Sequence, residues 1–528
     1  MSDEEHGCTL ESIYHHRAPH DLEHFHTIKP SVHHTVLYEL PYQPNGDSPP
    51  TPYSLSAACE PFTNSVRLAP NVRCVMRNPD GMQTVENRWT IVCRSLAKPI
   101  ANSRQLEAAI GKYNSDYRTR YQFTALHRLF EEQCDDAERA AFFGETLPRI
   151  IALALRLTEL IRVPIPLLLQ RQNRAVSMTQ QQAACLLANA FLCTFPQPRA
   201  FLAKSYPSVN FAQLFAGTSQ AVIEKLKCLC HYFRRVCTRM PTGVLTYLRR
   251  CVPKQDIPDW NTSPVCFTRH CIPMRVTVDG TIEDQGVGLL QMVFANRFIG
   301  GGVLGSGCVQ EEIRFVINPE LLVGRLLFES LRDNEAYLVL GAEQYCTYAN
   351  YASSFTFHAD HQDEMPRDAS GRRRCYIVGI DALRVQPDVN QFSEEAMKRE
   401  LAKAYVGFRH ELIDCPAPGI ATGNWGCGAF GGDTQLKALL QLMAACVAGR
   451  PLLYFTCNDG ALHEQLVSMY KFLVTRRISV RSLFQVLMSY AENNLHGKAD
   501  LYGYVYQHLW FSVVGGAPNF YQLSDVAK

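Results

Sequence analysis

Apolar residues change their spacing along the chain, from a helical period in the first half to shorter runs in the second. Three amphipathic stretches predict helices over 137–161, 179–194 and 219–239. From about residue 285, apolar runs of strand length alternate with amphipathic segments. These patterns predict strands at 289–295, 336–340, 375–380, 420–422 and 452–456, and helices at 319–331, 393–408, 434–448 and 463–475. The order of elements predicts a helical layer followed by an α/β core, a sheet flanked by helices.

The pattern divides the chain into three regions. Residues 1–55 are rich in His, Pro and polar residues without a sustained period, so a flexible leader is expected. Its histidines are interpreted as part of a solvated tail, with adventitious metal binding as the alternative. Residues 56–240 are predicted to form a mainly helical accessory domain, and residues 241–528 an α/β domain with C-terminal helices. Two cooperating units suit a chain of 528 residues.

Composition narrows the class of protein. With 47% hydrophobic and 19% charged residues the chain is ordinary for a globular protein, which argues against overall disorder. A formal net charge of +2 means that recognition of a phosphate-bearing ligand would need a local site. The 20 scattered cysteines and the absence of a basic-then-apolar leader favour a reducing compartment. No cysteine pair has zinc-knuckle spacing, and charges and prolines interrupt the apolar stretch 149–170, so neither a metal site nor a membrane span is expected.

A run of three glycines, Gly300, Gly301 and Gly302, follows the first predicted strand of the α/β region. Glycines leave the loop without Cβ atoms, so its backbone can approach a ligand closely and its N–H groups can point at an anion. A diphosphate suits such a loop, although a flexible turn accounts for the same three residues.

Two adjacent acids, Glu311 and Glu312, come shortly after the glycines. Glycosidic cleavage needs a proton donor for the leaving oxygen and then a base for water, and one carboxyl can serve both roles. Neighbouring residues on a helix diverge by roughly 100°. The pair therefore does not fit two equivalent facing carboxyls; one acid for the bond and one for a sugar hydroxyl is the better interpretation. The alternative is that both acids only favour a helix N-terminus.

A second glycine-rich segment, residues 421–433, lies between a predicted strand and a predicted helix. Backbone amides and a helix N-terminus can bind phosphate at such a position. Tight packing explains glycines equally well.

Three glycines, seven further residues and then Gln310-Glu311-Glu312 resemble the signature of poly(ADP-ribose) glycohydrolases. The flanking segments 295–298 and 313–320 look like those of the animal members, and the resemblance covers roughly residues 110–500. It implies a macrodomain-like α/β fold, a mixed sheet flanked by helices with an N-terminal helical accessory domain. It also implies hydrolysis of the ribose-ribose O-glycosidic bonds of poly(ADP-ribose), releasing ADP-ribose by carboxylate acid/base catalysis without metal or cofactor.

The resemblance further implies a role for each matching residue. Glu312 would protonate the leaving oxygen and then activate water, and Glu311 would bind ribose hydroxyls. The expected substrate-binding residues are Asn296, Gly300, Gly301, Gly302 and Gln310 around ADP-ribose, Tyr351 closing over it, Asn424, Gly426, Cys427, Gly428, Ala429 and Phe430 around the diphosphate, and Ile282 and Glu283 at the adenine end.

Two positions depart from the family pattern. Val293 stands where the family usually has an aspartate, and Cys457 where it often has an aromatic residue that stacks on adenine. Stacking on a base is worth roughly 1–3 kcal/mol, so weaker adenine binding is expected. The Val293 departure keeps a second interpretation open, an ADP-ribose-binding module with weak or no turnover. A glycosidase for ordinary polysaccharides is a remote third, because only four tryptophans are present.

The expected partners also follow from the resemblance. They are poly(ADP-ribose) and ADP-ribosylated proteins, with no membrane and no direct sequence-specific nucleic acid. A monomer in the nucleus and cytoplasm is expected, although no clear nuclear-import run of Lys and Arg occurs in the chain.

Overall fold

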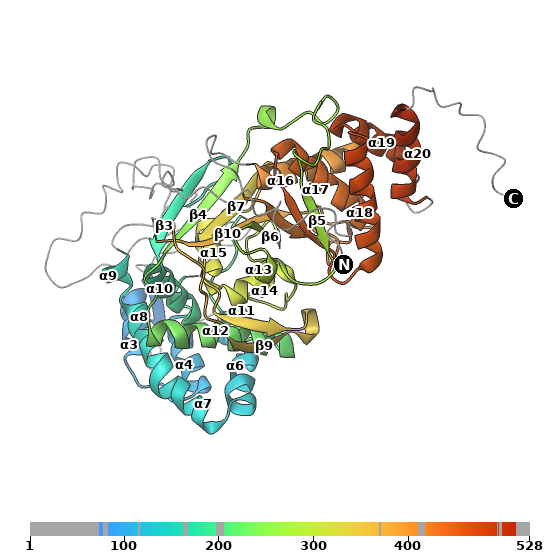
Figure 1. Cartoon of the computed structure of the whole chain (residues 1–528). Helices are drawn as coiled ribbons and strands as arrows, with labels where there is room; N and C mark the ends of the chain where they lie inside the picture. The colour runs from blue at the N-terminus through green and yellow to red at the C-terminus, as the bar shows by residue number, and fades with distance from the viewer. Residues whose placement is uncertain are drawn as a thin grey trace.

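A computed structural model of the chain describes residues 73–77, 83–114, 117–161, 167–196, 205–368, 371–409, 418–493, 495 and 499–513. The predicted leader, residues 1–55, lies outside the described residues. Figure 1 shows a sheet in the middle of the molecule, a group of helices at one end and the C-terminal helices on the opposite side.

An eight-stranded mixed sheet forms the centre of the fold, in the order β3-β4-β7-β10-β6-β11-β12-β5. Strands β10, β6, β11, β12 and β5 run parallel to one another, whereas β3, β4 and β7 are antiparallel to their neighbours. The strands are β3 (Arg174–Thr179), β4 (Val244–Cys251), β5 (Met274–Thr277), β6 (Leu290–Ala295), β7 (Glu335–Gly341), β10 (Arg373–Asp381), β11 (Ile420–Gly423) and β12 (Leu452–Phe455). The five predicted strands are present, and β3, β4 and β5 were not predicted.

The two faces of the sheet belong to two separate buried cores, which is why its inner strands are almost continuously buried. One core holds side chains of α16 (Glu394–Phe408), α17 (Thr434–Ala448), α18 (Gly460–Thr475), α19 (Val480–Glu492) and α20 (Leu501–Val513). The other holds side chains of α10 (Gln180–Phe191), α12 (Gln220–Thr238) and α14 (Gln310–Ile317). A mixed sheet flanked by helices, with a helical N-terminal region, is the predicted fold.

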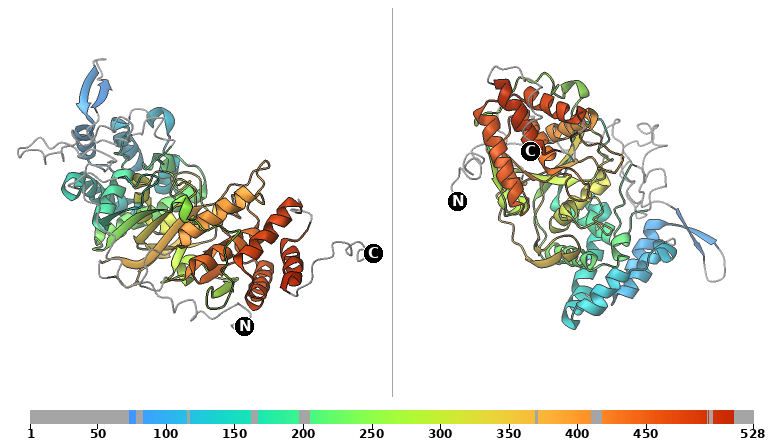
Figure 2. Two further views of the ribbon diagram at one scale, coloured as in Figure 1. Left: turned by 90° about the horizontal axis from the view of Figure 1, so that it is seen from above. Right: turned by 90° about the vertical axis from the view of Figure 1, so that its right-hand side faces the viewer.

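The helical region differs from its prediction in detail. The stretch 137–161 is not one helix: α7 (Asp136–Ala141), a π-helical turn (Phe142–Thr146), α8 (Leu147–Leu155) and α9 (Leu157–Leu160) follow one another. Strand β3, which also belongs to the region predicted as mainly helical, pairs with β4 along six residue pairs. This region therefore contributes a strand to the central sheet. Figure 2 shows from two further sides that the helical region lies against one end of the sheet.

The predicted helix over 319–331 is wrong. A 3-10 turn (Pro319–Val323) and α15 (Gly324–Leu327) take its place, and the backbone is extended at Phe328. The chain turns here because Leu168 and Phe328 form a parallel bridge, and the Leu168 N–H donates to the Leu327 carbonyl at 2.8 Å. A local apolar period cannot reveal such a long-range pairing.

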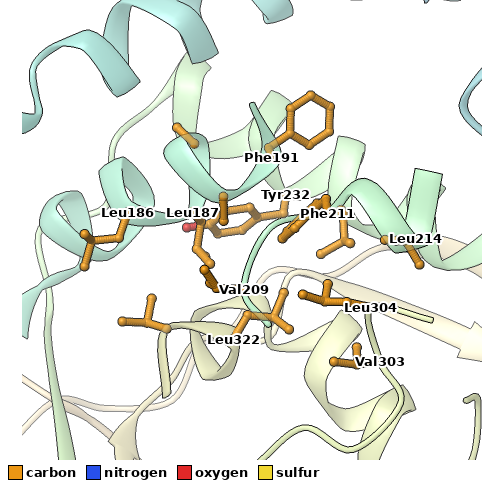
Figure 3. Close-up of a cluster of buried hydrophobic side chains, with 14 of the residues drawn as sticks. Leu186, Leu187, Phe191, Val209, Phe211, Leu214, Tyr232, Val303, Leu304 and Leu322 are labelled. Carbon is orange, nitrogen blue, oxygen red and sulfur yellow. The ribbon is translucent and has the colours of Figure 1, made fainter. Parts of the chain in front are cut away.

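The helical region and the loop after β6 share one apolar core. Figure 3 shows Leu187, Phe191 and Tyr232 from the helices in the same buried cluster as Leu304 and Leu322 from the α/β region. All five side chains are at most 1% exposed except Leu304 at 3%. The helices therefore support the segment that carries the triple glycine.

Candidate active site

The candidate site lies where β6 and β11 end. These parallel neighbours pair only at Leu290 and Gln291, and beyond that point the Gln310 side chain takes the place of β11. The Gln310 Oε1 accepts from the Phe294 N–H at 2.9 Å, and its Nε2 donates to the Met292 carbonyl at 3.1 Å. Strands that separate at their carboxyl ends are the usual place for ligands in open α/β sheets. Both glycine-rich loops start at this edge.

Helix α14 begins directly after the first loop and presents Glu311 and Glu312 in its first turn. Its N-cap residue, Val309, has no side-chain oxygen, so only the second half of a capping box is formed: the Glu312 Oε2 accepts the Val309 N–H at 2.9 Å. The free N–H groups of a helix N-terminus also favour negative charge there.

Glu311 is the inner of the two acids. Its side chain is buried, and its two oxygens accept the N–H groups of Asn296 at 2.7 Å and Gly300 at 2.8 Å. Burial, and then the charge of Glu312, hold the pKa of Glu311 well above its usual range, although both hydrogen bonds act in the opposite direction.

Glu312 is clamped by the same loop. Its Oε1 accepts the Gly302 N–H at 2.8 Å, while Oε2 caps the helix at Val309. Gly301 lies between the two carboxyls with a φ of +46°, and a Cβ there would be 2.6 Å from Glu312 Oε1 and 2.7 Å from Glu311 Oε2. Only glycine allows the loop to pass so close to both acids.

Two buried cations hold the loop from behind. Lys225 of α12 donates to the carbonyls of Val303, Gly305 and Gly307 at 2.9, 2.7 and 2.5 Å. Arg325 of α15 donates to the carbonyls of Ile299 and Gly301. Burial lowers the pKa of Lys225 to about 8 and that of Arg325 to about 10.

Sequence reasoning missed both cations. Lys225 is one of several basic residues in the predicted helix 219–239, and Arg325 is a single basic residue in an apolar run; both patterns are typical of surface positions.

Tyr351 covers the start of α14. It lies between β8 (Cys346–Ala349) and β9 (Thr356–Asp360), which form a hairpin, and its hydroxyl accepts the Gln310 N–H at 2.8 Å. The side chain is 50% exposed, yet burial of the hydroxyl end raises the pKa of Tyr351 to about 12, with smaller contributions from Cys457 and Glu312. The predicted closing tyrosine and the predicted acid are therefore neighbours.

The Asn296 side chain is half-buried between the loop and solvent. Its Oδ1 accepts the Phe298 N–H at 3.0 Å, which fixes the turn after β6.

The second loop is built around Gly426, whose φ is +77° and whose Cβ would be 2.6 Å from that of Ala382. The Gly432 N–H closes the loop on the Gly426 carbonyl at 2.8 Å. Asn424 is structural: its Nδ2 donates to Thr456 and its Oδ1 accepts from Tyr454. The remaining predicted residues are exposed (Gly428 and Ala429) or half-buried (Cys427 and Phe430).

The predicted adenine end is only partly open to a ligand. Ile282 packs in a small buried cluster with Phe455, while the Glu283 carboxyl accepts from the Tyr348 hydroxyl at 2.6 Å. Burial and then the charge of Glu283 raise the pKa of the Cys457 thiol, so Cys457 belongs to this end. Its backbone has a φ of +57°.

Within the part of the chain that the structure describes, no group of three or more His, Cys, Asp or Glu residues could hold a metal ion. Nor do those residues include a helix long and apolar enough to cross a membrane. Their cysteines are free thiols.

Comparison with known proteins gives one consistent result. Residues 257–464 match the family model of the poly(ADP-ribose) glycohydrolase Macro domain fold, and residues 134–249 match the model of the helical domain of the same family. The chain is 32% identical over 458 residues to poly(ADP-ribose) glycohydrolase 1 of Arabidopsis thaliana, covering 71% of this chain and 82% of that protein. It is 31% identical over 295 residues to poly(ADP-ribose) glycohydrolase 2 of Caenorhabditis elegans, covering 54% of this chain and 60% of that protein.

Proposed function

The chain belongs to the poly(ADP-ribose) glycohydrolase family, and we propose that it hydrolyses the ribose-ribose O-glycosidic bonds of poly(ADP-ribose) and releases ADP-ribose. One observation supports this most strongly. Two adjacent buried carboxyls accept backbone N–H groups from one glycine loop at the carboxyl edge of the sheet. The narrower expectation of an animal-type member stays a prediction.

Glu312 is the proposed acid and base. It is the outer carboxyl, within electrostatic range of the half-exposed Tyr351, whereas Glu311 contacts the core. In the first step the Glu312 proton passes to the bridging ribose oxygen as the glycosidic bond breaks, and the departing ribose leaves with that oxygen as a hydroxyl. In the second step ionised Glu312 removes a proton from water as the water oxygen bonds to the anomeric carbon.

Glu311 is proposed to accept hydrogen bonds from hydroxyls of the ribose that carries the anomeric carbon. Its negative charge would also stabilise the oxocarbenium-like transition state. Asn296 is proposed to orient the same ribose, because its Nδ2 is free of a described partner while its Oδ1 is fixed in the turn.

The two glycine loops are proposed to hold the rest of ADP-ribose. Residues 300–302 would shape the ribose end, and residues 424 and 426–430 would enclose the diphosphate. Gln310 and Asn424 contribute indirectly, because their side chains bond to the backbone of neighbouring strands. Tyr351 would close over the substrate, and Ile282 and Glu283 would line the adenine end.

Protein-bound polymer is the proposed physiological substrate, so ADP-ribosylated proteins are the expected partners. We also propose a monomer that acts in the nucleus and cytoplasm, where such polymer is made and released. Direct sequence-specific binding of nucleic acid and association with membranes are not part of the proposal.

The decisive experiment incubates the whole chain with purified poly(ADP-ribose) and measures free ADP-ribose by chromatography. Release of ADP-ribose with multiple turnovers is expected. An ADP-ribose-binding module is the competing function, favoured by Val293, which supplies no carboxylate at its buried position. Tight ADP-ribose binding without any release at high protein concentration would establish that module and reject the hydrolase.

A further inference from the structure

Three residues form a row across the sheet on the face that carries the acidic pair. In the strand register, Gly379 of β10 stands opposite Val293 of β6 on one side and Tyr337 of β7 on the other. Val293 and Tyr337 belong to the same buried core as Ile313 and Phe315 of α14. The row therefore lies beneath the helix that bears Glu311.

Gly379 leaves a gap that the Tyr337 ring fills. A Cβ at position 379 would be 2.0 Å from the Tyr337 Cζ and 2.4 Å from its hydroxyl oxygen, closer than any real Cβ contact. The ring thus extends from β7 over Gly379 of β10, and its hydroxyl end lies on the side of β6. Without glycine at 379 this side chain would have to point elsewhere.

The Tyr337 hydroxyl has no described partner with hydrogen-bond geometry, although the side chain is fully buried. An unpaired buried hydroxyl costs free energy, so one that persists calls for an explanation. It lies beside the Glu311 carboxyl: burial first, and then the charge and closeness of Glu311, hold the pKa of Tyr337 well above its usual range.

Val293 is the third member of the row and brings no polar atom to it. The side chain is 1% exposed and stands where the resembled signature has an aspartate. The hydroxyl of Tyr337 instead delivers a polar group to this place from a strand two positions away in the sheet.

We propose that Tyr337 is a positioning residue for the reaction: its hydroxyl donates a hydrogen bond to the Glu311 carboxylate when ribose binds, and Gly379 provides the space for it. The inference rests on the proposed function, because Glu311 is assigned there to the ribose hydroxyls. A donor stabilises the ionised carboxylate and fixes the direction of its free lone pairs. It therefore opposes the burial and the Glu312 charge that both favour protonation of Glu311.

Tyr337→Phe tests the proposal, because it keeps the ring and removes only the hydroxyl. Loss of the donor raises the pKa of Glu311, so the acidic limb of the kcat/KM profile should move up by about one pH unit, with about a tenfold loss of kcat/KM below that limb. The matched control is Tyr232→Phe, which removes an equally buried hydroxyl without a described partner, on α12 away from Glu311. The control should keep the wild-type profile.

Gly379→Ala is a second, independent variant. Its methyl group would displace the Tyr337 ring, so the same shift of the acidic limb should appear together with a lower melting temperature. Wild-type pH profiles in Tyr337→Phe would overturn the proposal, and so would equal shifts in Tyr337→Phe and Tyr232→Phe.

ADP-ribose binding keeps this test separate from the test of the hydrolase. Calorimetric titration of ADP-ribose between pH 5 and 8 reports on Glu311 without turnover. As the pH is lowered, the affinity of Tyr337→Phe for ADP-ribose should begin to decrease at a higher pH than the affinity of the wild-type chain. If the wild-type chain releases no ADP-ribose, the proposed function fails. If it does release ADP-ribose and Tyr337→Phe binds and reacts like wild type at every pH, only the role of Tyr337 fails.

Discussion

Lys225 of helix α12 donates a hydrogen bond to the carbonyl oxygen of Gly305 at 2.7 Å. With its bonds to Val303 and Gly307, this one ammonium group connects the helical region to the loop that carries the acidic pair. A lysine ammonium has three donors and a neutral amine has two. The loop is therefore best held while Lys225 is charged.

Lys225→Met should disorder the loop and lower kcat/KM by about 10- to 100-fold, because three buried carbonyls lose their donor. Lys227→Met is the control, since Lys227 lies on the same helix and pairs with Glu224. Burial lowers the pKa of Lys225 to about 8, so wild-type activity should decline above that pH. Unchanged kinetics of Lys225→Met would remove this lysine from any role in the site.

Glu312→Gln should abolish turnover and leave ADP-ribose binding within about tenfold of wild type. The amide keeps the shape of the side chain and one acceptor for the loop, but it has no proton to transfer to the leaving oxygen. Polymer hydrolysis and calorimetric titration measure the two properties separately. Residual hydrolysis near the wild-type rate would assign the acid to another group.

Gly301→Ala should reduce hydrolysis by at least about a hundredfold. The new Cβ would lie within 2.7 Å of an oxygen of each carboxyl, and its φ of +46° is strained for any side chain. Gly460→Ala is the matched control, because position 460 starts α18 and has no atom within 4 Å of the new Cβ. Equal activities of the two variants would show that the loop does not need to approach the acids closely.

Glu320 should make the fold less stable as pH rises. It is fully buried, accepting from Gln180 and Tyr345, and burial raises its pKa to about 7 from an ordinary 4.5. Between these two values the folded chain binds more protons than the unfolded chain, so stability falls across that window. The loss amounts to about 3 kcal/mol above pH 7.

Glu320→Gln lacks this titration. As the pH is raised from 5 to 8, urea unfolding should show that the free energy of unfolding of Glu320→Gln increases relative to wild type by about 3 kcal/mol. The control Glu395→Gln, at an exposed position, should follow wild type throughout. A parallel pH dependence of Glu320→Gln and wild type would refute a raised pKa at Glu320.

Much of the fold follows from local sequence patterns. The strands β6, β7, β10, β11 and β12 and the helices α10, α12, α16, α17 and α18 lie where the apolar period placed them. Strand β4 was missed because Arg249 and Arg250 interrupt its apolar run. Arg249 can be buried because it pairs with Glu335 of β7 at 2.5 Å and donates to the carbonyls of Leu168 and Glu329. Strand β5 was missed because Arg275 and Thr277 alternate with its two apolar residues, Met274 and Val276, which leaves too few apolar positions for a strand to be recognised.

By itself the sequence determined the family, the glycine triplet and the two glutamates. These residues lie within one short segment, so their spacing can be read directly from the chain. Only the tertiary structure decided which groups surround them. Lys225, Arg325 and Tyr337 come from separate elements, and each contacts the loop or Glu311 through packing between those elements. The spacing of apolar residues within one helix or strand indicates which of its faces is buried. The partner of a buried polar group, in contrast, depends on contacts between segments far apart in the chain.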